Sequence, residues 1–519
     1  MILVRTISRL LLATGLVALS FGGLQAAEKP AVKKAPAKVT KAADTPQIFT
    51  TSHQGRFGGS RVGYQAVAGE TFLKNKKGQP EAAIFSVAYL RDGVTDTSRR
   101  PVLFIFNGGP GSASLWLHLG LFGPRRVDVP SDATDDGAAP YKLVDNPLSV
   151  LDIADLVFID PVGTGYSRAL GDKKPEDFWG VTKDARSISR FIRRWLSVNK
   201  RWNSPKYLAG ESYGTMRAVA VTNQLEGGVN DVSLNGVILI STVLNSIYSD
   251  ARQGNEMAYI AFLPTYAATA WYHNRITPRP TGLKAFLAEA REFALNDYAR
   301  ALLAGSRLDT ETHHRVRARL AHFTGLSEDY LERARLRVSP GRFQRQLLRA
   351  EGKVIGRLDG RYTGREFDDV GETPSADPSF YGIDGAYTAA INTYLAGELG
   401  VTMDRQFETL GFDVFRKWDW DVGGGGGIRP SSVNVAPFLG RAMQQNSAFR
   451  VLQASGYFDF ATPFFAAENT MARNGIDASR VRFVYFEAGH MMYIHQPSLK
   501  RLGAEIRAFV SPPNSGKSR

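Results

Sequence analysis

The 519-residue sequence predicts an α/β fold in which a mostly parallel central sheet carries helices on both faces. Short β-type runs alternate with helical patterns up to about residue 250, whereas the strand signal vanishes from about 251 to 360. Strand-like runs return near the C-terminus. We therefore expect a core of residues 47–250 and 436–511, interrupted by a mainly helical cap insertion at 251–435.

The first part of the core supplies five predicted strands and one long helix. Its uninterrupted apolar runs, such as Val102–Phe106, are typical of strands buried on both faces. The spacing of apolar residues predicts a helix over Asp184–Asn199. The predicted strands are Ile84–Leu90, Val102–Phe106, Leu156–Ile159, Lys206–Ala209 and Val237–Ile240.

The remainder of the chain begins with the insertion, where Ala, Leu and Arg recur at helical spacing, as in Leu283–Leu303. Two further strands are predicted at Arg450–Ala454 and Val481–Phe486, and a helix near Leu499–Phe509 closes the fold. Residues 512–519 are expected to form a disordered tail.

The N-terminus has the pattern of an export signal. Arg5 and Arg9 precede the apolar run Leu10–Phe21, and small residues follow, so we expect a signal peptide at 1–27. Residues 28–46 are rich in Lys, Ala and Pro and predict a flexible linker. We expect a bacterial protein that is periplasmic or secreted, without stable membrane insertion after cleavage; an uncleaved anchor is the alternative.

Composition excludes several kinds of chemistry. The chain contains no cysteine, which rules out disulfides, cysteine nucleophiles and thiolate metal ligands. The formal charge of +14 includes seven Lys/Arg against two acidic residues within 1–45, outside the predicted fold. Residues 281–350 add thirteen Lys/Arg against eight acidic residues along predicted helices. This pattern indicates solvated helical surface, so we expect no nucleic-acid partner. We also predict no metal and no cofactor.

The pentapeptide Gly210-Glu211-Ser212-Tyr213-Gly214 is the most informative motif. It lies between the apolar segment Tyr207–Ala209 and the small-residue helical stretch Met216–Val221. A serine with glycines at ±2 on a strand-to-helix turn is the nucleophile-elbow pattern of α/β-hydrolases. Taken alone, the motif also fits a glycine-rich turn with a surface serine.

A nucleophilic serine needs a base, and that base needs an orienting acid. In α/β-hydrolases both follow the serine, acid first, at the ends of later strands. Here Arg450–Ala454 leads to Asp459, and Val481–Phe486 leads to His490. We therefore predict a triad of Ser212, Asp459 and His490. Three rival acids end no strand-like run: Asp413, Asp419 and Asp421.

An oxyanion intermediate needs two preorganised N–H donors. We expect one from the backbone of Tyr213, directly after the nucleophile. The other is expected from the loop Asn107–Gly111, which follows the strand Val102–Phe106 and whose glycines permit close approach. A phosphate-binding role for this loop is disfavoured, because no Lys-Ser/Thr pair follows it.

Together these segments resemble the serine carboxypeptidase family. The matching pieces are Asn107–Ser114, Asp160–Ser167, Gly210–Thr215, Gly456–Asp459 and Gly489–Met491. The resemblance implies an α/β-hydrolase core with a helical cap, and an acyl-enzyme mechanism that releases C-terminal residues from peptides. It covers the core well and the insertion poorly.

The resemblance also implies residue roles. By the family's pattern, Gly109 and Tyr213 supply the oxyanion N–H groups, while Asn107, Gly108 and Glu211 bind the carboxylate of a peptide with a free C-terminus. Because that carboxylate would repel an ionised Glu211, we expect a raised pKa for Glu211 and activity favoured at mildly acidic pH. The alternative is that Glu211 is a buried structural acid.

The chain departs from the family at three positions: Ser112 stands where cysteine is common, Tyr457 where many relatives have aspartate, and Tyr493 where proline is usual. None of these removes a predicted catalytic group. Two other functions stay open, namely a related esterase or acyltransferase using the same triad, and a secreted binding protein without turnover.

Overall fold

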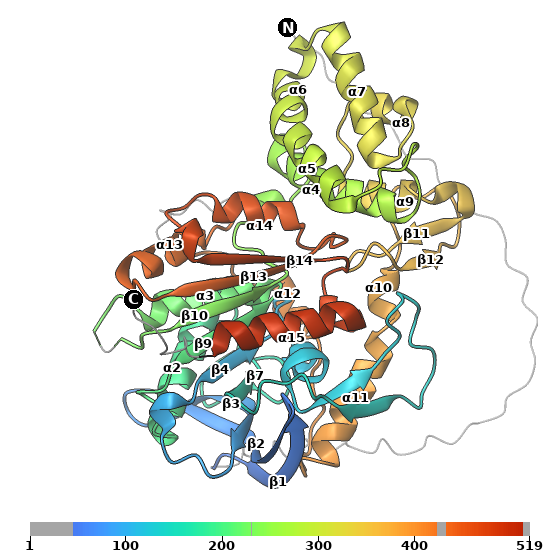
Figure 1. Cartoon of the computed structure of the whole chain (residues 1–519). Coiled ribbons are helices and arrows are strands. Elements are labelled where there is room, and N and C mark those ends of the chain that lie inside the picture. Colours follow the sequence, from blue (N-terminus) through green and yellow to red (C-terminus); the bar gives the residue numbers. More distant parts are fainter. Residues whose placement is uncertain (1–44, 230, 423–431, 512–519) are drawn as a thin grey trace, which may run out of the picture. The chain divides into compact units, whose positions relative to one another are not determined.

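The computed structural model describes residues 45–229, 231–422 and 432–511 and contains a ten-stranded sheet (Figure 1). The predicted signal peptide, most of the linker and the tail lie outside these ranges. Along the sheet the order is β1 (Ile48–Phe57), β2 (Ser60–Lys74), β3 (Pro80–Arg91), β7 (Asp155–Ile159), β4 (Val102–Phe106), β9 (Lys206–Glu211), β10 (Gly236–Ile240), β13 (Arg450–Gly456) and β14 (Val481–Phe486), with β8 (Arg168–Ala169) paired to β3.

The strands from β7 to β14 run parallel, whereas β1, β2 and β3 form an antiparallel edge. This confirms the predicted mostly parallel central sheet. The strands β1 and β2 were not predicted. In β1 exposed and half-buried residues alternate, so its sequence carries no long apolar run.

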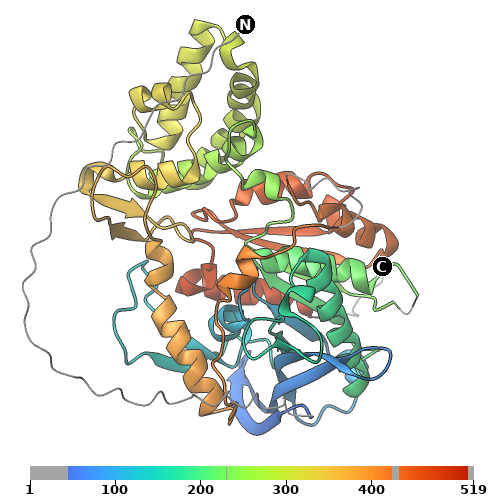
Figure 2. The same ribbon diagram turned by 180° about the vertical axis from the view of Figure 1, so that it is seen from behind.

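Alternate residues of the central strands face different helices. Leu103 and Ile105 of β4 belong to a buried cluster that includes α15 (Gln496–Val510). Phe104 of the same strand belongs to a second cluster with α2 (Val181–Val198) and α3 (Tyr213–Leu225). Accordingly α15 lies in front of the sheet in Figure 1, and α2 and α3 come to the front in Figure 2. Helices therefore cover both faces, as predicted.

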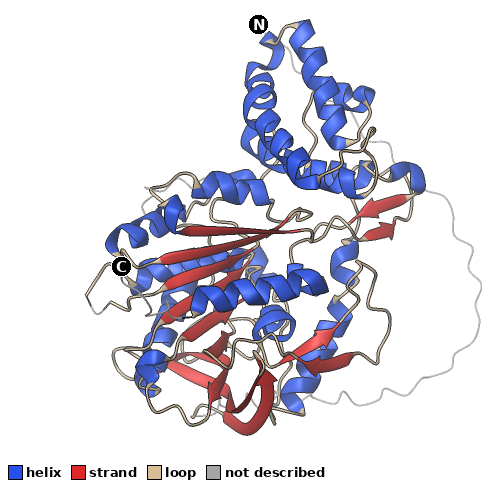
Figure 3. Cartoon of the chain, in the orientation of Figure 1, coloured by secondary structure: helices blue, strands red, loops and turns tan. Residues whose placement is uncertain are grey.

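The first half of the insertion is helical, and its helices pack in a hydrophobic cluster that also contains Phe458, Phe460, Phe464 and Phe465 of the core. A two-stranded ribbon of β11 (Lys353–Ile355) and β12 (Thr363–Arg365) follows these helices (Figure 3). The helices are α4 (Glu256–Tyr272), α5 (Leu283–Phe293), α6 (Ala299–Ala304), α7 (Thr310–Thr324), α8 (Glu328–Arg333) and α9 (Pro340–Gln346).

The second half of the predicted insertion packs differently. Tyr387, Ile391 and Tyr394 of α11 (Asp384–Ala396) are buried in the cluster that also contains α15, and therefore belong to the core of the sheet. The other elements are α1 (Leu115–Leu117), β5 (Arg125–Asp128), β6 (Lys142–Asp145), α10 (Pro378–Tyr381), α12 (Phe412–Arg416), α13 (Ala436–Gln445) and α14 (Phe464–Met471). No helix in the described part of the chain has both the length and the apolar composition needed to cross a bilayer.

The parallel strands end at one edge of the sheet, where ligands bind in open α/β sheets. The residues that directly follow β4, β9 and β10 at this edge are Asn107, Ser212 and Ser241. The loops after β13 and β14 carry Asp459 and His490 to the same edge. The topology thus gathers the predicted site residues from segments up to about 380 positions apart.

Candidate active site

Ser212 occupies a strained turn between β9 and α3. Its φ of 60° and ψ of −130° are rare for a residue with a side chain. The turn is so tight that a Cβ on Gly210 would lie 2.0 Å from the carbonyl oxygen of Gly214. The Ser212 N–H donates to the carbonyl of Ile240 at 3.0 Å, which fixes the turn to β10.

Asp459 and His490 form a buried hydrogen-bonded pair. His490 Nδ1 lies 2.8 Å from Asp459 Oδ2, and the two residues are 5% and 0% exposed. The other carboxylate oxygen, Oδ1, accepts the backbone N–H groups of Ala461 at 2.8 Å and Thr462 at 2.9 Å. Burial alone would lower the pKa of His490, but the charge and hydrogen bond of Asp459 outweigh it and raise that pKa. The pair therefore favours a protonated imidazole.

The backbone of His490 is held on both sides. Its N–H donates to the carbonyl of Leu358 at 2.6 Å, and its carbonyl accepts the Ser241 hydroxyl at 2.6 Å. Within the described residues the imidazole bonds only through Nδ1, so Nε2 is left to accept a proton. Ser241 directly follows a predicted strand, but nothing in the sequence links it to His490. No sequence signal points to Leu358.

The loop after β4 lies against the elbow. A Cβ on Gly108 would be 2.6 Å from the backbone nitrogen of Tyr213, and Gly109 has a φ of +102° that favours glycine. Tyr213 is the first residue of α3, where backbone N–H groups have no partner inside the helix. The structure thus brings together the two backbone segments expected to supply oxyanion donors.

Glu211 is buried beside this loop, with 2% of its surface exposed. Its Oε2 accepts hydrogen bonds from the side-chain amide of Asn107 and from the Tyr493 hydroxyl, the latter at 3.0 Å. Its Oε1 is buried without a hydrogen-bond partner among the described residues. Burial raises the pKa of Glu211 to about 7, against the opposing effects of His490, Tyr493 and Asn107. The carboxyl group is therefore protonated in a large fraction of molecules near neutrality.

The amide of Asn107 has a fixed orientation. Its Oδ1 accepts the Leu117 N–H at 3.0 Å, which directs its NH₂ group toward Glu211. Its backbone carbonyl accepts a hydrogen bond from the buried Arg217 of α3, whose Nε also donates to Asp184 at 2.6 Å. Arg217, held by Asp184, thus fixes the backbone at the start of the glycine loop.

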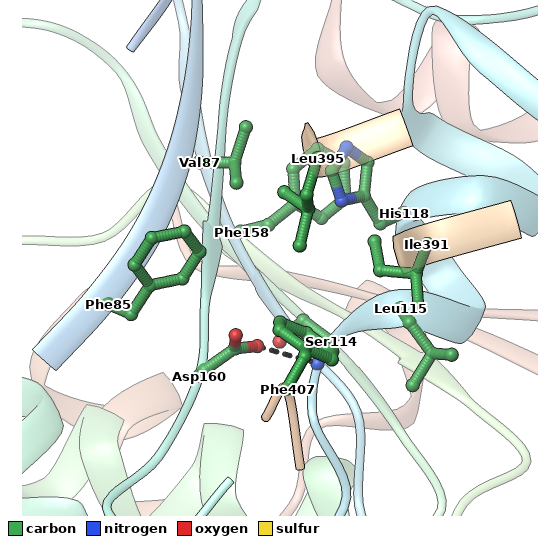
Figure 4. A pocket seen from close by; sticks show the side chains of 10 residues that line it. All are labelled: Phe85, Val87, Ser114, Leu115, His118, Phe158, Asp160, Ile391, Leu395 and Phe407. Carbon is green, nitrogen blue, oxygen red and sulfur yellow. Dashed lines mark hydrogen bonds between the residues drawn. The ribbon is translucent and has the colours of Figure 1, made fainter. Parts of the chain in front are cut away.

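A small cavity next to Ser114, at the end of this loop, is lined by two buried ionisable groups (Figure 4). Asp160 accepts the Ser114 N–H at 2.8 Å, and burial raises the pKa of Asp160 to about 7. His118 lies 2.6 Å from the Tyr89 hydroxyl, and burial lowers its pKa to about 3. Asp160 therefore fixes the end of the loop Asn107–Ser114. Among the described residues, no three His, Asp or Glu side chains are grouped to hold a metal ion.

Parts of this chain are similar to known serine carboxypeptidases. The model of the serine carboxypeptidase family matches residues 83–279, which include the glycine loop and Ser212. Serine carboxypeptidase-like 13 of Arabidopsis thaliana is 28% identical over 164 residues, covering 31% of this chain and 35% of that protein. The pheromone-processing carboxypeptidase KEX1 of Cryptococcus gattii is 34% identical over 120 residues, covering 23% of this chain and 17% of that protein.

The chain thus aligns with about a third or less of the length of these relatives. A solved structure resembles much more of it. The prohormone-processing carboxypeptidase Kex1 from Saccharomyces cerevisiae covers 88% of this chain and 93% of its own, with a TM-score of 0.53 and 16% identity. This likeness shows a common fold. Asp459 and His490 lie beyond the segment matched by the family model, and the structure brings them to the edge that carries Ser212.

Proposed function

We propose that the chain is a member of the serine carboxypeptidase family, and that it releases C-terminal residues from peptides through an acyl-enzyme on Ser212. The observation that carries this proposal is the pair of buried hydrogen bonds on either side of the elbow. One joins Asp459 to His490, and the other joins Asn107 to Glu211. The first serves acyl transfer, and the second serves recognition of a free carboxyl terminus.

In the first half-reaction His490 Nε2 accepts the proton of Ser212 Oγ as this oxygen attacks the scissile carbonyl carbon. Asp459 stabilises the imidazolium that forms, and the N–H groups of Gly109 and Tyr213 stabilise the oxyanion. His490 then donates its proton to the leaving amine, which departs as the C-terminal amino acid. In the second half-reaction His490 deprotonates a water that hydrolyses the ester, and Ser212 is regenerated.

Glu211 acts in this scheme as a neutral acid. Its protonated carboxyl donates a hydrogen bond to the terminal carboxylate of the substrate, and Asn107 and the backbone of Gly108 bind the same group. The 3.0 Å hydrogen bond from Tyr493 supports this role by occupying Oε2, which leaves the unpartnered Oε1 for substrate. Binding of a free carboxyl terminus, relative to its amide, is then favoured below the Glu211 pKa of about 7.

Two measurements test the function. Labelling with a fluorophosphonate should modify the wild-type protein and not Ser212→Ala; a folded wild type that is not labelled would favour a binding protein without turnover. Mass spectrometry of a mixed peptide library should show residues leaving one at a time from the C-terminus. Labelling without such release would instead favour an esterase or acyltransferase.

We further propose that the protein is exported to the bacterial periplasm or secreted. The support is the sequence of residues 1–27, in which two arginines precede an apolar run and small residues. N-terminal sequencing of protein isolated from the native cell should begin near residue 28, after the predicted signal peptide. A sequence that begins at Met1 would contradict export with cleavage.

A further inference from the structure

One short turn of the insertion contacts both loops that carry the proposed acid and base. It comprises residues Arg357–Arg361, between β11 and β12, and we refer to it as the brace. The brace is itself anchored within the insertion, since the N–H groups of Leu358 and Asp359 donate to the Ser379 hydroxyl at 2.9 and 3.1 Å. Its contacts with the triad loops bridge residues about 100 to 130 positions apart.

On the side of the base, the brace bonds two consecutive residues. The His490 N–H donates to the carbonyl of Leu358 at 2.6 Å, and the Gly489 N–H donates to Asp359 Oδ2 at 3.0 Å. The fit is close, because a Cβ on Gly489 would lie 2.4 Å from the Cβ of Asp359. The backbone that presents the imidazole is therefore held by one carbonyl and one carboxylate.

On the side of the acid, the brace bonds the two neighbours of Asp459. The Gly360 N–H donates to the carbonyl of Phe458 at 2.8 Å, and the Phe460 N–H donates to the carbonyl of Arg357 at 3.0 Å. The loop after β13 carries Asp459 and is called the acid loop; the loop after β14 carries His490 and is called the base loop. The brace thus fixes both loops to a common element.

The Asp359 carboxylate, which accepts the Gly489 N–H, is itself held in place by Arg361. Arg361 donates to it through Nε at 3.0 Å and Nη2 at 2.6 Å, and both side chains are largely buried. Such a paired fork holds a carboxylate in one orientation. Arg361 also donates to the carbonyl of Glu487 at 3.3 Å, so the pair spans the base loop.

We propose that Asp359 is a positioning residue for the reaction: locked by Arg361, it holds Gly489–His490 so that the imidazole remains aligned with Asp459 and Ser212. The inference rests on the proposed function, because it gives His490 the role of base. A displacement of about 1 Å in a reacting group can cost on the order of 100-fold in rate. The insertion would then help to hold the proposed base in place.

The test compares Asp359→Ala with Asp359→Asn. The first removes the acceptor of the Gly489 N–H, whereas the second keeps a side-chain oxygen in its place. We expect Asp359→Ala to lower kcat for peptides and the rate of Ser212 labelling by about 10- to 100-fold, with KM little changed. Asp359→Asn should recover most of both rates. Glu256→Ala is the matched control, because it removes an ion pair of the insertion, to Arg337, that does not touch either triad loop.

Equal labelling rates in Asp359→Ala and Glu256→Ala would overturn the proposal, as would an Asp359→Asn rate as low as that of Asp359→Ala. If Asp359→Ala does not fold, Arg361→Met replaces it; slower labelling would support the brace, and the wild-type rate would refute it. Labelling needs the base but no particular substrate. A wild type that is labelled but releases no amino acids would therefore refute the peptidase and leave this test intact.

Discussion

Glu211 stands directly before the proposed nucleophile, and its protonation state decides what it can bind. One oxygen already accepts two hydrogen bonds, while the other has no partner among the described residues. An ionised carboxylate in this position would repel a substrate carboxylate and leave a buried charge only partly compensated. A proton on the free oxygen removes both problems, because it neutralises the group and supplies a donor.

Replacing Glu211 by glutamine should separate recognition from ionisation. Because the Glu211 pKa is raised to about 7, the wild type holds the donor proton below this pH and loses it above. We expect the ratio of kcat/KM for a free-acid peptide to that for its C-terminal amide to fall as the pH rises through about 7. In Glu211→Gln, which is neutral at every pH, the ratio should stay flat from pH 5 to 9.

The amide substrate corrects for titration of His490, which affects both peptides equally. Glu226→Gln is a suitable control, because burial raises the pKa of Glu226 to about 6 but the residue caps the far end of α3. Its ratio should follow that of the wild type. A wild-type ratio independent of pH would remove the role proposed for Glu211.

At the scale of elements, a buried ion pair between Arg217 and Asp184 joins α3 to α2 beside the strands β4 and β9. Arg217 of α3 donates to Asp184 of α2 and to the carbonyl of Asn107, and its guanidinium lies 5.1 Å from the centre of the Tyr213 ring. One side chain thus ties two helices to the glycine loop and to the residue after the nucleophile. The cost of burying these charges is offset only while both partners are present.

Removing one member of this pair should therefore destabilise the fold strongly. We expect Arg217→Met to lower the free energy of unfolding by about 3–5 kcal/mol, because Asp184 is left buried and unpaired. The double variant Arg217→Met/Asp184→Leu should recover much of the loss. Urea denaturation measures both. The exposed Arg333, paired with Asp329 on α8, provides a control whose replacement by Met should have little effect. A loss no larger than this control would contradict the anchoring role.

The elements of the core were predictable to the extent that their signals are local. Val102–Phe106 has its predicted bounds, and β7 and β10 each begin one residue before the predicted start, because strands buried on both faces are marked by continuous apolar runs. The strands β3, β9 and β13 extend further than predicted, to Pro80–Arg91, Lys206–Glu211 and Arg450–Gly456. The order of Ser212, Asp459 and His490 after successive strands also follows from sequence, and the structure places each at the same edge of the sheet.

The supporting residues were not predictable in the same way. The hydrogen bond between Asp359 and Gly489 joins residues 130 positions apart, and that between Ser241 and His490 spans 249. Neither pair leaves a periodic or local pattern. In the sequence, Tyr493 stands out only because relatives usually have proline at this position. Its hydrogen bond to Glu211 depends on how the loop after β14 folds back. The roles of these supporting residues can therefore be recognised only from the tertiary structure.

At the scale of the whole molecule, the insertion and the core share one hydrophobic cluster. Phe458 and Phe460, on either side of Asp459, are buried together with Tyr266 of α4 and Phe286 of α5. Arg291 of α5 also forms two close hydrogen bonds with Glu468 of α14, at 2.7 and 2.9 Å. The acid loop is thus part of the core of the insertion.

This sharing predicts that insertion and active site unfold together. Far-UV circular dichroism, near-UV circular dichroism and Ser212 labelling should be lost in coincident transitions as urea is raised. Phe286→Ala, deep in the insertion, should lower the free energy of unfolding by about 3–5 kcal/mol and shift all three midpoints equally. The exposed Phe412 is the control, and Phe412→Ala should move none of them. If Phe286→Ala produced an early loss of helical signal while labelling persisted, the insertion would be an independent unit. The orientation of His490 would then not depend on the folded helices of the insertion.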